Sequence, residues 1–175
     1  LGTLGARSST VLKVPSSSLT TPSSEYFFSA LNSFSKQNIS YLAIEASSHG
    51  LEQQRMNGLK VQVAVFTNLS RDHLDYHSNM DAYFESKQKL FLDYLADGGH
   101  AVINIDDPYG KKLLENVRKR PVSIVTFGED SQADFRIESI KPTSYGLELN
   151  VLFKDKKYTC PLGLTGTFQA SNALA

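Results

Sequence analysis

The chain has 175 residues, of which 41% are hydrophobic and 21% charged, a composition typical of a globular protein that can bury a real core. Its 18 basic and 18 acidic side chains cancel, so we predict neither a nucleic-acid-binding nor a membrane-binding protein, because both need clustered basic residues. No apolar run approaches the ~20 residues that cross a bilayer. The single cysteine, Cys160, cannot form an internal disulfide, which favours a reducing compartment such as the cytoplasm.

The first forty residues are predicted to form a loop followed by a helix. Residues 1–22 are rich in Gly, Ser, Thr and Pro, with one short apolar run at 11–14 that is a candidate strand. Ser23 or Ser24 is expected to cap the helix that follows, which ends near Asn38. On residue type alone, Thr20 and Thr21 belong to the start of that helix.

Two short apolar runs predict buried strands. The run 41–46, YLAIEA, leads into Ser47 and His49, and the run 61–67, VQVAVFT, leads into a polar segment. In open α/β sheets ligands gather beyond the carboxyl ends of the strands, so Glu45 is well placed for a site. Its alternative role is that of an ion-pair partner.

The segment 68–91, NLSRDHLDYHSNMDAYFESKQKLF, combines a polar turn with a helix. The turn contains Asp72, His73, Asp75 and His77, which together suggest a charged site that could bind a cation. Apolar residues then recur with helical spacing on one face: Met80, Tyr83, Phe84, Phe91, Tyr94 and Leu95.

Lys87 falls inside this apolar stripe, whereas Lys89 is rotated to the opposite side of the helix. An ammonium group on an apolar face either reaches water through its stem or loses part of its affinity for the proton. A neutral amine is a nucleophile that can be modified. Both interpretations of Lys87 follow from the pattern.

The C-terminal half is predicted to complete an α/β fold. We expect strands at 99–105 and 122–127, with a helix between them that starts after Asp106 and Asp107 and ends near Lys119. From residue 133 to 161 the apolar pattern alternates, which indicates an antiparallel excursion with a turn at 144–146. The predicted fold class is α/β, a mostly parallel sheet flanked by helices with this small antiparallel addition.

Three motifs resemble the central, ATP-binding domain of the Mur ligases, which has a P-loop NTPase-like fold. They are NLSRDHLDYH followed by YxxxKxxLF, EASSHGLEQQR at 45–55, and GLTGTFQASNALA at 163–175. The similarity is greatest to the branch that adds the third residue of the peptidoglycan stem peptide. It extends over residues 1–175, which would be part of the central domain, truncated at both ends.

The resemblance implies roles for particular residues. Lys87 would be carbamylated and, with His73, catalytic, while Glu45, His73 and Lys87 would hold Mg²⁺. A UDP-MurNAc-dipeptide would contact Thr20, Thr21, Ser47, Gln53 and Arg55. Asn172 would contact the adenine of ATP. Two positions depart from the family pattern, because Leu19 and Gln169 each stand where an asparagine is usual.

The implied activity is ATP-dependent amide-bond formation through an acyl phosphate. A monomeric cytoplasmic ligase would add meso-diaminopimelate or L-lysine to UDP-MurNAc-L-Ala-D-Glu. The phosphate-binding motif GxxxxGK[ST] does not occur in these residues, so we expect the isolated segment to be inactive. One alternative is a metal-dependent hydrolase with zinc on the His/Asp cluster, and another is a non-catalytic binding module. The roles of Asp72, Asp75 and His77 stay open.

Overall fold

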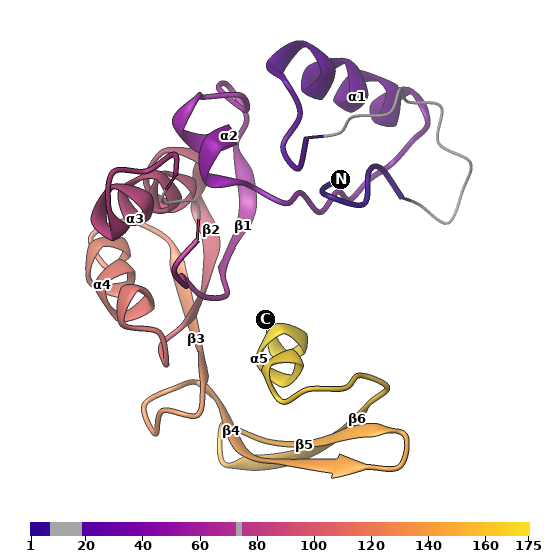
Figure 1. The fold of residues 1–175 in the computed structure, drawn as a ribbon, viewed down its shortest axis with the longest axis vertical. Helices are drawn as coiled ribbons and strands as arrows, with labels where there is room; N and C mark the ends of the chain where they lie inside the picture. Colours follow the sequence, from indigo (N-terminus) through magenta and orange to yellow (C-terminus); the bar gives the residue numbers. More distant parts are fainter. Residues whose placement is uncertain (8–18, 73–74) are drawn as a thin grey trace. The chain divides into compact units, whose positions relative to one another are not determined.

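The computed structural model describes residues 1–7, 19–72 and 75–175, which form two compact units (Figure 1). Unit 1 comprises Leu1–Leu59 and His73–Tyr94, and unit 2 comprises Lys60–Asp72 and Leu95–Ala175. The candidate strand at 11–14 and the candidate ligand His73 lie outside the described residues.

Unit 1 is built from helices around a small apolar core. Its elements are α1 (Ser24–Lys36), α2 (Ser48–Glu52), α3 (Met80–Lys89) and the π-helical turn η1 (Leu90–Tyr94). The core cluster consists of Phe27, Leu51, Met56 and Tyr94. The predicted first helix is confirmed, with Ser23 at the N-cap position.

The predicted strand at 41–46 is wrong. No strand is assigned there, and Tyr41 is 94% exposed instead of buried. The segment is extended, and its backbone bonds to Leu1, whose amino group donates to the carbonyl of Ala43 (2.8 Å) and whose carbonyl accepts from the amide of Glu45 (2.9 Å). A strand needs a ladder of partners, and two bonds to one residue do not make one.

The helix expected to continue from Met80 to Leu95 changes geometry part-way. The α-helix ends at Lys89, the wider turn η1 follows, and Leu95 is already the first residue of a strand. Phe91, Tyr94 and Leu95 are all buried, as the stripe predicted. Apolar spacing does not distinguish an α turn from a π turn, so the burial was predicted correctly and the helix end was not.

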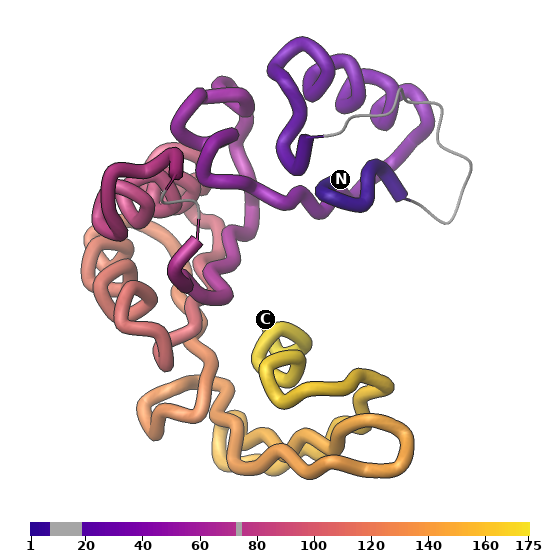
Figure 2. Tube along the Cα trace, in the orientation of Figure 1, coloured from indigo at the N-terminus to yellow at the C-terminus, as the bar shows by residue number. Residues whose placement is uncertain are grey.

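Unit 2 contains one six-stranded sheet in the order β1-β2-β3-β4-β5-β6. The strands are β1 (Val61–Phe66), β2 (Leu95–Asn104), β3 (Ser123–Gly128), β4 (Phe135–Thr143), β5 (Gly146–Phe153) and β6 (Lys156–Leu162). Pairing is parallel from β1 to β4 and antiparallel from β4 to β6. The chain trace shows the two reversals that join β4, β5 and β6 (Figure 2). The predicted mostly parallel sheet with an antiparallel excursion is confirmed.

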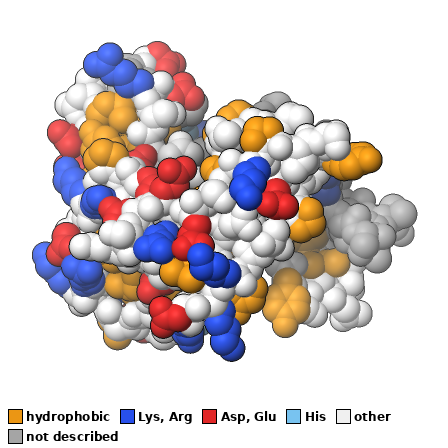
Figure 3. All heavy atoms as spheres, turned by 90° about the horizontal axis from the view of Figure 1, so that it is seen from below, with side chains coloured by type: hydrophobic (Ala, Val, Ile, Leu, Met, Phe, Trp, Pro, Cys, Tyr) orange, Lys and Arg blue, Asp and Glu red, His pale blue; other side chains and the backbone are white. Residues whose placement is uncertain are grey.

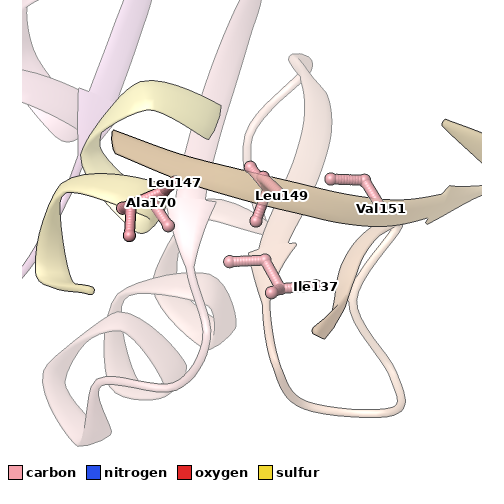
Figure 4. Packing of buried hydrophobic residues seen from close by; sticks show 5 residues of the cluster. All are labelled: Ile137, Leu147, Leu149, Val151 and Ala170. Carbon is pink, nitrogen blue, oxygen red and sulfur yellow. The ribbon is translucent and has the colours of Figure 1, made fainter. Parts of the chain in front are cut away.

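The antiparallel part has a core of its own. Leu147, Leu149 and Val151 alternate along β5 and point to one face, where Ile137 of β4 and Ala170 of α5 (Phe168–Leu174) complete the cluster (Figure 4). The alternation follows from the two-residue period of a strand. The turn predicted at 144–146 joins β4 to β5, as expected.

Asp106 and Asp107 have the structural role expected from their position before a helix. Asp107 caps α4 (Pro108–Val117) by accepting from the amides of Tyr109 (2.7 Å) and Gly110 (3.4 Å), and it also accepts from the amide of Leu69 (2.7 Å). Asp106 accepts from the amides of Glu129 and Asp130. The two carboxylates thus join α4 to the loops after β1 and β3.

We expect Gly110→Ala to destabilise unit 2 by about 3 kcal/mol. Gly110 is buried in α4 against the last residue of β2, and an added Cβ would collide with the carbonyl oxygen of Asn104. The gain of about 1 kcal/mol in helix propensity is too small to offset a backbone clash. Thermal unfolding of the full-length parent protein measures the effect. Gly163→Ala is the control, because its Cβ would meet nothing within 4 Å, and equal melting temperatures would contradict the prediction.

Candidate functional site

Glu45 is held in place by threonines from two other segments. Its Oε2 accepts from the amide (2.8 Å) and the hydroxyl (2.9 Å) of Thr3, and the Thr3 hydroxyl lies 3.0 Å from that of Thr20. Gly2 lies so close that a Cβ there would meet Oε2 at 2.5 Å. Glu45 is exposed. The carboxylate is therefore both oriented and accessible.

The buried side chain of Thr21 connects Glu45 to α2. Its hydroxyl donates to the carbonyl of Glu45 (2.9 Å) and accepts from the amide of Ser47 (2.9 Å). The hydroxyl of Ser47 lies 3.1 Å from it and accepts from the amide of Gly50 (3.1 Å), which caps α2. Gly50 packs directly on Thr21, since a Cβ there would meet the threonine side chain at 2.6 Å. The pair Thr20–Thr21 and the segment 45–50 thus form one hydrogen-bonded structure.

Arg55 lies on the same structure. Its Nη1 donates to the carbonyl of Thr21 (2.7 Å), while Nε and Nη2 both donate to Oε1 of Gln53 (3.0 and 2.7 Å). Nε2 of Gln53 donates in turn to the hydroxyl of Tyr76 (3.1 Å). These contacts use three of the five N–H donors of a guanidinium group. The fork is fixed in orientation, as recognition of a carboxylate or phosphate requires.

Lys87 lies on α3 near this cluster. Burial lowers the pKa of Lys87, and the negative charge of Glu45 opposes that shift with a smaller effect. Nζ is 5.9 Å from the centre of the Tyr83 ring. A lysine whose head were fully hydrated would not lose affinity for the proton in this way. Lys87 is thus a partly buried amine beside Tyr83, and its modification stays a prediction.

The His/Asp turn does not form a metal centre in the part of the chain that the structure describes. No three His, Cys, Asp or Glu side chains lie close enough together there to hold a metal ion. His77 is buried, and both of its ring nitrogens have partners: Nε2 contacts Oγ of Ser48 (3.0 Å) and Nδ1 contacts Oε2 of Glu52 (3.4 Å). Asp72 and Asp75 are exposed. The described geometry thus gives the zinc-hydrolase alternative no ligand set.

Asn172 belongs to unit 2. It is exposed on α5, and its amide nitrogen lies 3.5 Å from Oε1 of Gln169, one turn earlier. On the face shown in Figure 3, basic and acidic side chains are interspersed. An ion pair of unit 2 joins Lys157 to Glu138 (2.9 Å). Within the described residues no helix has both the length and the apolar character to span a bilayer.

The structure brings most of the predicted site residues together. The members found in unit 1 are Thr20, Thr21, Glu45, Ser47, Gln53, Arg55 and Lys87. Sequence reasoning missed Thr3 and Tyr76, which orient Glu45 and Gln53. Thr3 lies in a Gly- and Thr-rich stretch whose composition predicts a loop and indicates no functional residue. Tyr76 stood inside the HLDYH segment, where the charged neighbours dominated the interpretation.

This arrangement can be compared with known proteins. The family description "Mur ligase middle domain" matches residues 1–175. The chain belongs to the Mur ligase family. The expected resemblance to the Mur ligases is therefore confirmed, and similar curated relatives carry the enzyme name of the branch expected from the sequence.

Two curated relatives are each named UDP-N-acetylmuramoyl-L-alanyl-D-glutamate–2,6-diaminopimelate ligase. The one from Zymomonas mobilis is 38% identical over 174 residues, which is 99% of this chain and 35% of the relative. The one from Chromobacterium violaceum is 42% identical over 156 residues, 89% of this chain and 31% of the relative. The chain thus spans about a third of the length of these relatives.

Solved structures agree in fold. A UDP-N-acetylmuramoyl-L-alanyl-D-glutamate–2,6-diaminopimelate ligase superposes with a TM-score of 0.84 at 31% identity, over 100% of this chain and 35% of that chain. Folylpolyglutamate synthetase from Lactobacillus casei gives 0.61 at 17% identity, over 85% of this chain and 34% of that chain. The second similarity shows the fold alone.

Proposed function

We propose that the parent protein is an ATP-dependent ligase that adds a diamino acid to UDP-MurNAc-L-Ala-D-Glu. The observation that carries the proposal is the cluster of Glu45, Thr21, Ser47 and Arg55 beside a lysine of lowered pKa, in a Mur ligase domain. The names of the similar relatives favour meso-diaminopimelate over L-lysine as the added amino acid. The reaction would take place in the cytoplasm, in a monomer.

The substrate contacts are assigned to unit 1. Thr20, Thr21, Ser47, Gln53 and Arg55 would bind the UDP-MurNAc-dipeptide. Arg55 is the strongest candidate for an anionic group, because its fork is already held by Thr21 and Gln53. Preorganisation of this kind lowers the conformational entropy lost on binding.

The residues near Lys87 fit a magnesium ion. Mg²⁺ prefers oxygen ligands, and Glu45 offers an exposed, oriented carboxylate. An ammonium group beside Glu45 would repel the cation, whereas a carbamate on Lys87 would supply two more oxygen ligands that share one negative charge. Glu45, carbamylated Lys87 and His73 would hold the ion, which would neutralise charge as phosphate is transferred to the dipeptide carboxylate.

The nucleotide site would be completed elsewhere in the parent protein. Asn172 would contact adenine, but these 175 residues contain no GxxxxGK[ST] motif to cradle the phosphates. We propose that residues 1–175 are part of the central domain and that the segment alone has no ligase activity.

ADP release by the full-length parent protein tests the proposal. The assay contains ATP, Mg²⁺, bicarbonate and UDP-MurNAc-L-Ala-D-Glu, with meso-diaminopimelate or L-lysine as the amine. ADP release that depends on diaminopimelate would support the ligase, and dependence on lysine would correct the amino acid. Folded protein that releases ADP with neither amine would overturn the proposal. ATP-independent hydrolysis by a zinc-loaded protein would favour the hydrolase instead.

Thr3→Val should raise the Mg²⁺ concentration needed for half-maximal activity about 10-fold. The substitution keeps the shape and the backbone donor of Thr3 but removes the hydroxyl that donates to Oε2 of Glu45. Titration calorimetry with Mg²⁺ measures the same change without turnover. Thr3→Ser retains the hydroxyl and is the control, and an unchanged Mg²⁺ dependence in the valine variant would contradict this role.

A further inference from the structure

His77 is a buried polar side chain that the proposed chemistry does not use. Only 3% of its surface is exposed, and its ring stacks on Tyr83 of α3 with a centroid distance of 5.0 Å and an angle of 15° between the planes. Stacking alone would be served as well by a phenylalanine. Since a buried imidazole must satisfy two ring nitrogens, its polar contacts need a reason.

Those contacts join two helices. Nε2 of His77 lies 3.0 Å from the hydroxyl of Ser48, the first residue of α2, and Nδ1 faces Oε2 of Glu52, the last residue of α2, at 3.4 Å. A carboxylate accepts only, so the proton belongs on Nδ1 and the hydroxyl of Ser48 donates to Nε2. His77 therefore contacts both ends of α2 while its ring lies on α3.

A second contact between the helices reinforces the first. Ser86 of α3 is buried, and its hydroxyl lies within hydrogen-bond reach of two acceptors, the carbonyl of Ala82 (3.2 Å) and Oε2 of Glu52 (3.4 Å). Oε2 of Glu52 thus contacts both Nδ1 of His77 and the hydroxyl of Ser86. Because α2 has only five residues, its own hydrogen bonds cannot fix its position. Its position depends on the buried Leu51, on the Thr21–Ser47 contacts and on these polar side chains.

The helices α2 and α3 lie next to residues of the proposed site, so a network that joins the two helices can affect that site. The segment around α2 holds Ser47, Gln53 and Arg55, while Lys87 follows Ser86 directly on α3. We propose that His77 is a positioning residue that locks α2 onto α3 and so sets the place of the dipeptide-binding segment relative to Lys87. The inference rests on the proposed function for its effect on turnover, but not for the coupling itself.

The coupling is tested in the full-length parent protein by hydrogen exchange without substrates. His77→Phe keeps the stacked ring and removes the polar contacts with Ser48 and Glu52, so the amides of Gly50 and Leu51 should exchange about 10-fold faster. The amides of β2 should not change. Phe34→Leu, a buried substitution in α1, controls for general loosening of unit 1. Unchanged protection of α2 in His77→Phe would overturn the proposal.

Kinetics then separate positioning from mere stability. His77→Phe should raise the KM for UDP-MurNAc-L-Ala-D-Glu about 10-fold and leave the KM for ATP unchanged. His77→Gln places a polar group at the Nε2 position and should restore most of the affinity through Ser48, whereas His77→Asn restores only the contact with Glu52. If all three variants have the wild-type KM for the dipeptide substrate and for ATP, the role of His77 in substrate binding is overturned. A wild-type protein without turnover would refute the ligase, and the exchange data would still decide the coupling.

Discussion

If the proposed function holds, replacing Lys87 with alanine is expected to lower the kcat of the full-length parent protein by about 100- to 1000-fold, the usual loss when one group that stabilises developing charge is removed. Lys87→Arg should be equally inactive, because a guanidinium keeps the positive charge and cannot form a carbamate. Steady-state ADP release measures both variants. This prediction rests on the proposed carbamate at Lys87, an amine of α3 that lies over the face of Tyr83 and whose pKa is lowered by burial.

The sign of the pH dependence can be worked out from the same shift. Only the neutral amine adds CO₂, forming a carbamate and releasing a proton. Because the pKa of Lys87 lies below the ordinary lysine value of about 10.4, more of its amine is neutral at a given pH than in an unperturbed lysine. At low bicarbonate, activity should therefore fall as the pH decreases, and added bicarbonate should restore it.

Lys89→Ala is the matched control, since Lys89 lies two positions further along the same helix and is also half-buried. It should retain nearly full activity. The carbamate itself is observable by carbon NMR after labelling with ¹³C-bicarbonate, as a signal present in the wild type and absent in Lys87→Arg. An active Lys87→Arg enzyme, or no such signal in an active wild type, would refute the carbamate.

Local patterns predicted those parts of the fold that depend on local interactions. The helix start after Asp107, the turn between β4 and β5 and the alternation along β5 each follow from a few neighbouring residues, and each is confirmed. The segment 41–46 was mispredicted because a strand depends on what pairs with it, and that partner cannot be read from YLAIEA. Here Leu1 supplies only two backbone bonds.

The site was predictable to a similar extent. Glu45, Thr21, Ser47 and Arg55 were proposed from motifs, and the structure places them in one hydrogen-bonded cluster. Thr3 could not be found in this way, because it bonds to a residue 42 positions away from a stretch without a pattern. His77 was noticed for its charge, yet its role depends on burial between α2 and α3, which no spacing reveals.

Arg55→Lys is expected to raise the KM for UDP-MurNAc-L-Ala-D-Glu about 10- to 100-fold, which corresponds to the loss of one charge-assisted bidentate interaction. Lysine keeps the positive charge but has no fork, so it cannot hold the carbonyl of Thr21 and Oε1 of Gln53 while facing an anion. The KM for ATP should stay the same. Arg118→Lys is the control, because Arg118 is an exposed partner of Glu115 (2.6 Å).

A double-mutant cycle shows whether Arg55 acts alone or through Gln53. Nε and Nη2 of Arg55 both donate to one oxygen of Gln53, so Gln53→Ala releases the fork as well as removing an amide. If the two side chains bind the dipeptide as a unit, Arg55→Lys should add little to Gln53→Ala, and the effects on KM should be clearly non-additive. Additive effects would mean that Arg55 reaches the substrate without support from Gln53. An unchanged KM with a lower kcat would instead mean that Arg55 stabilises the transition state and does not contribute to binding of the substrate in the ground state.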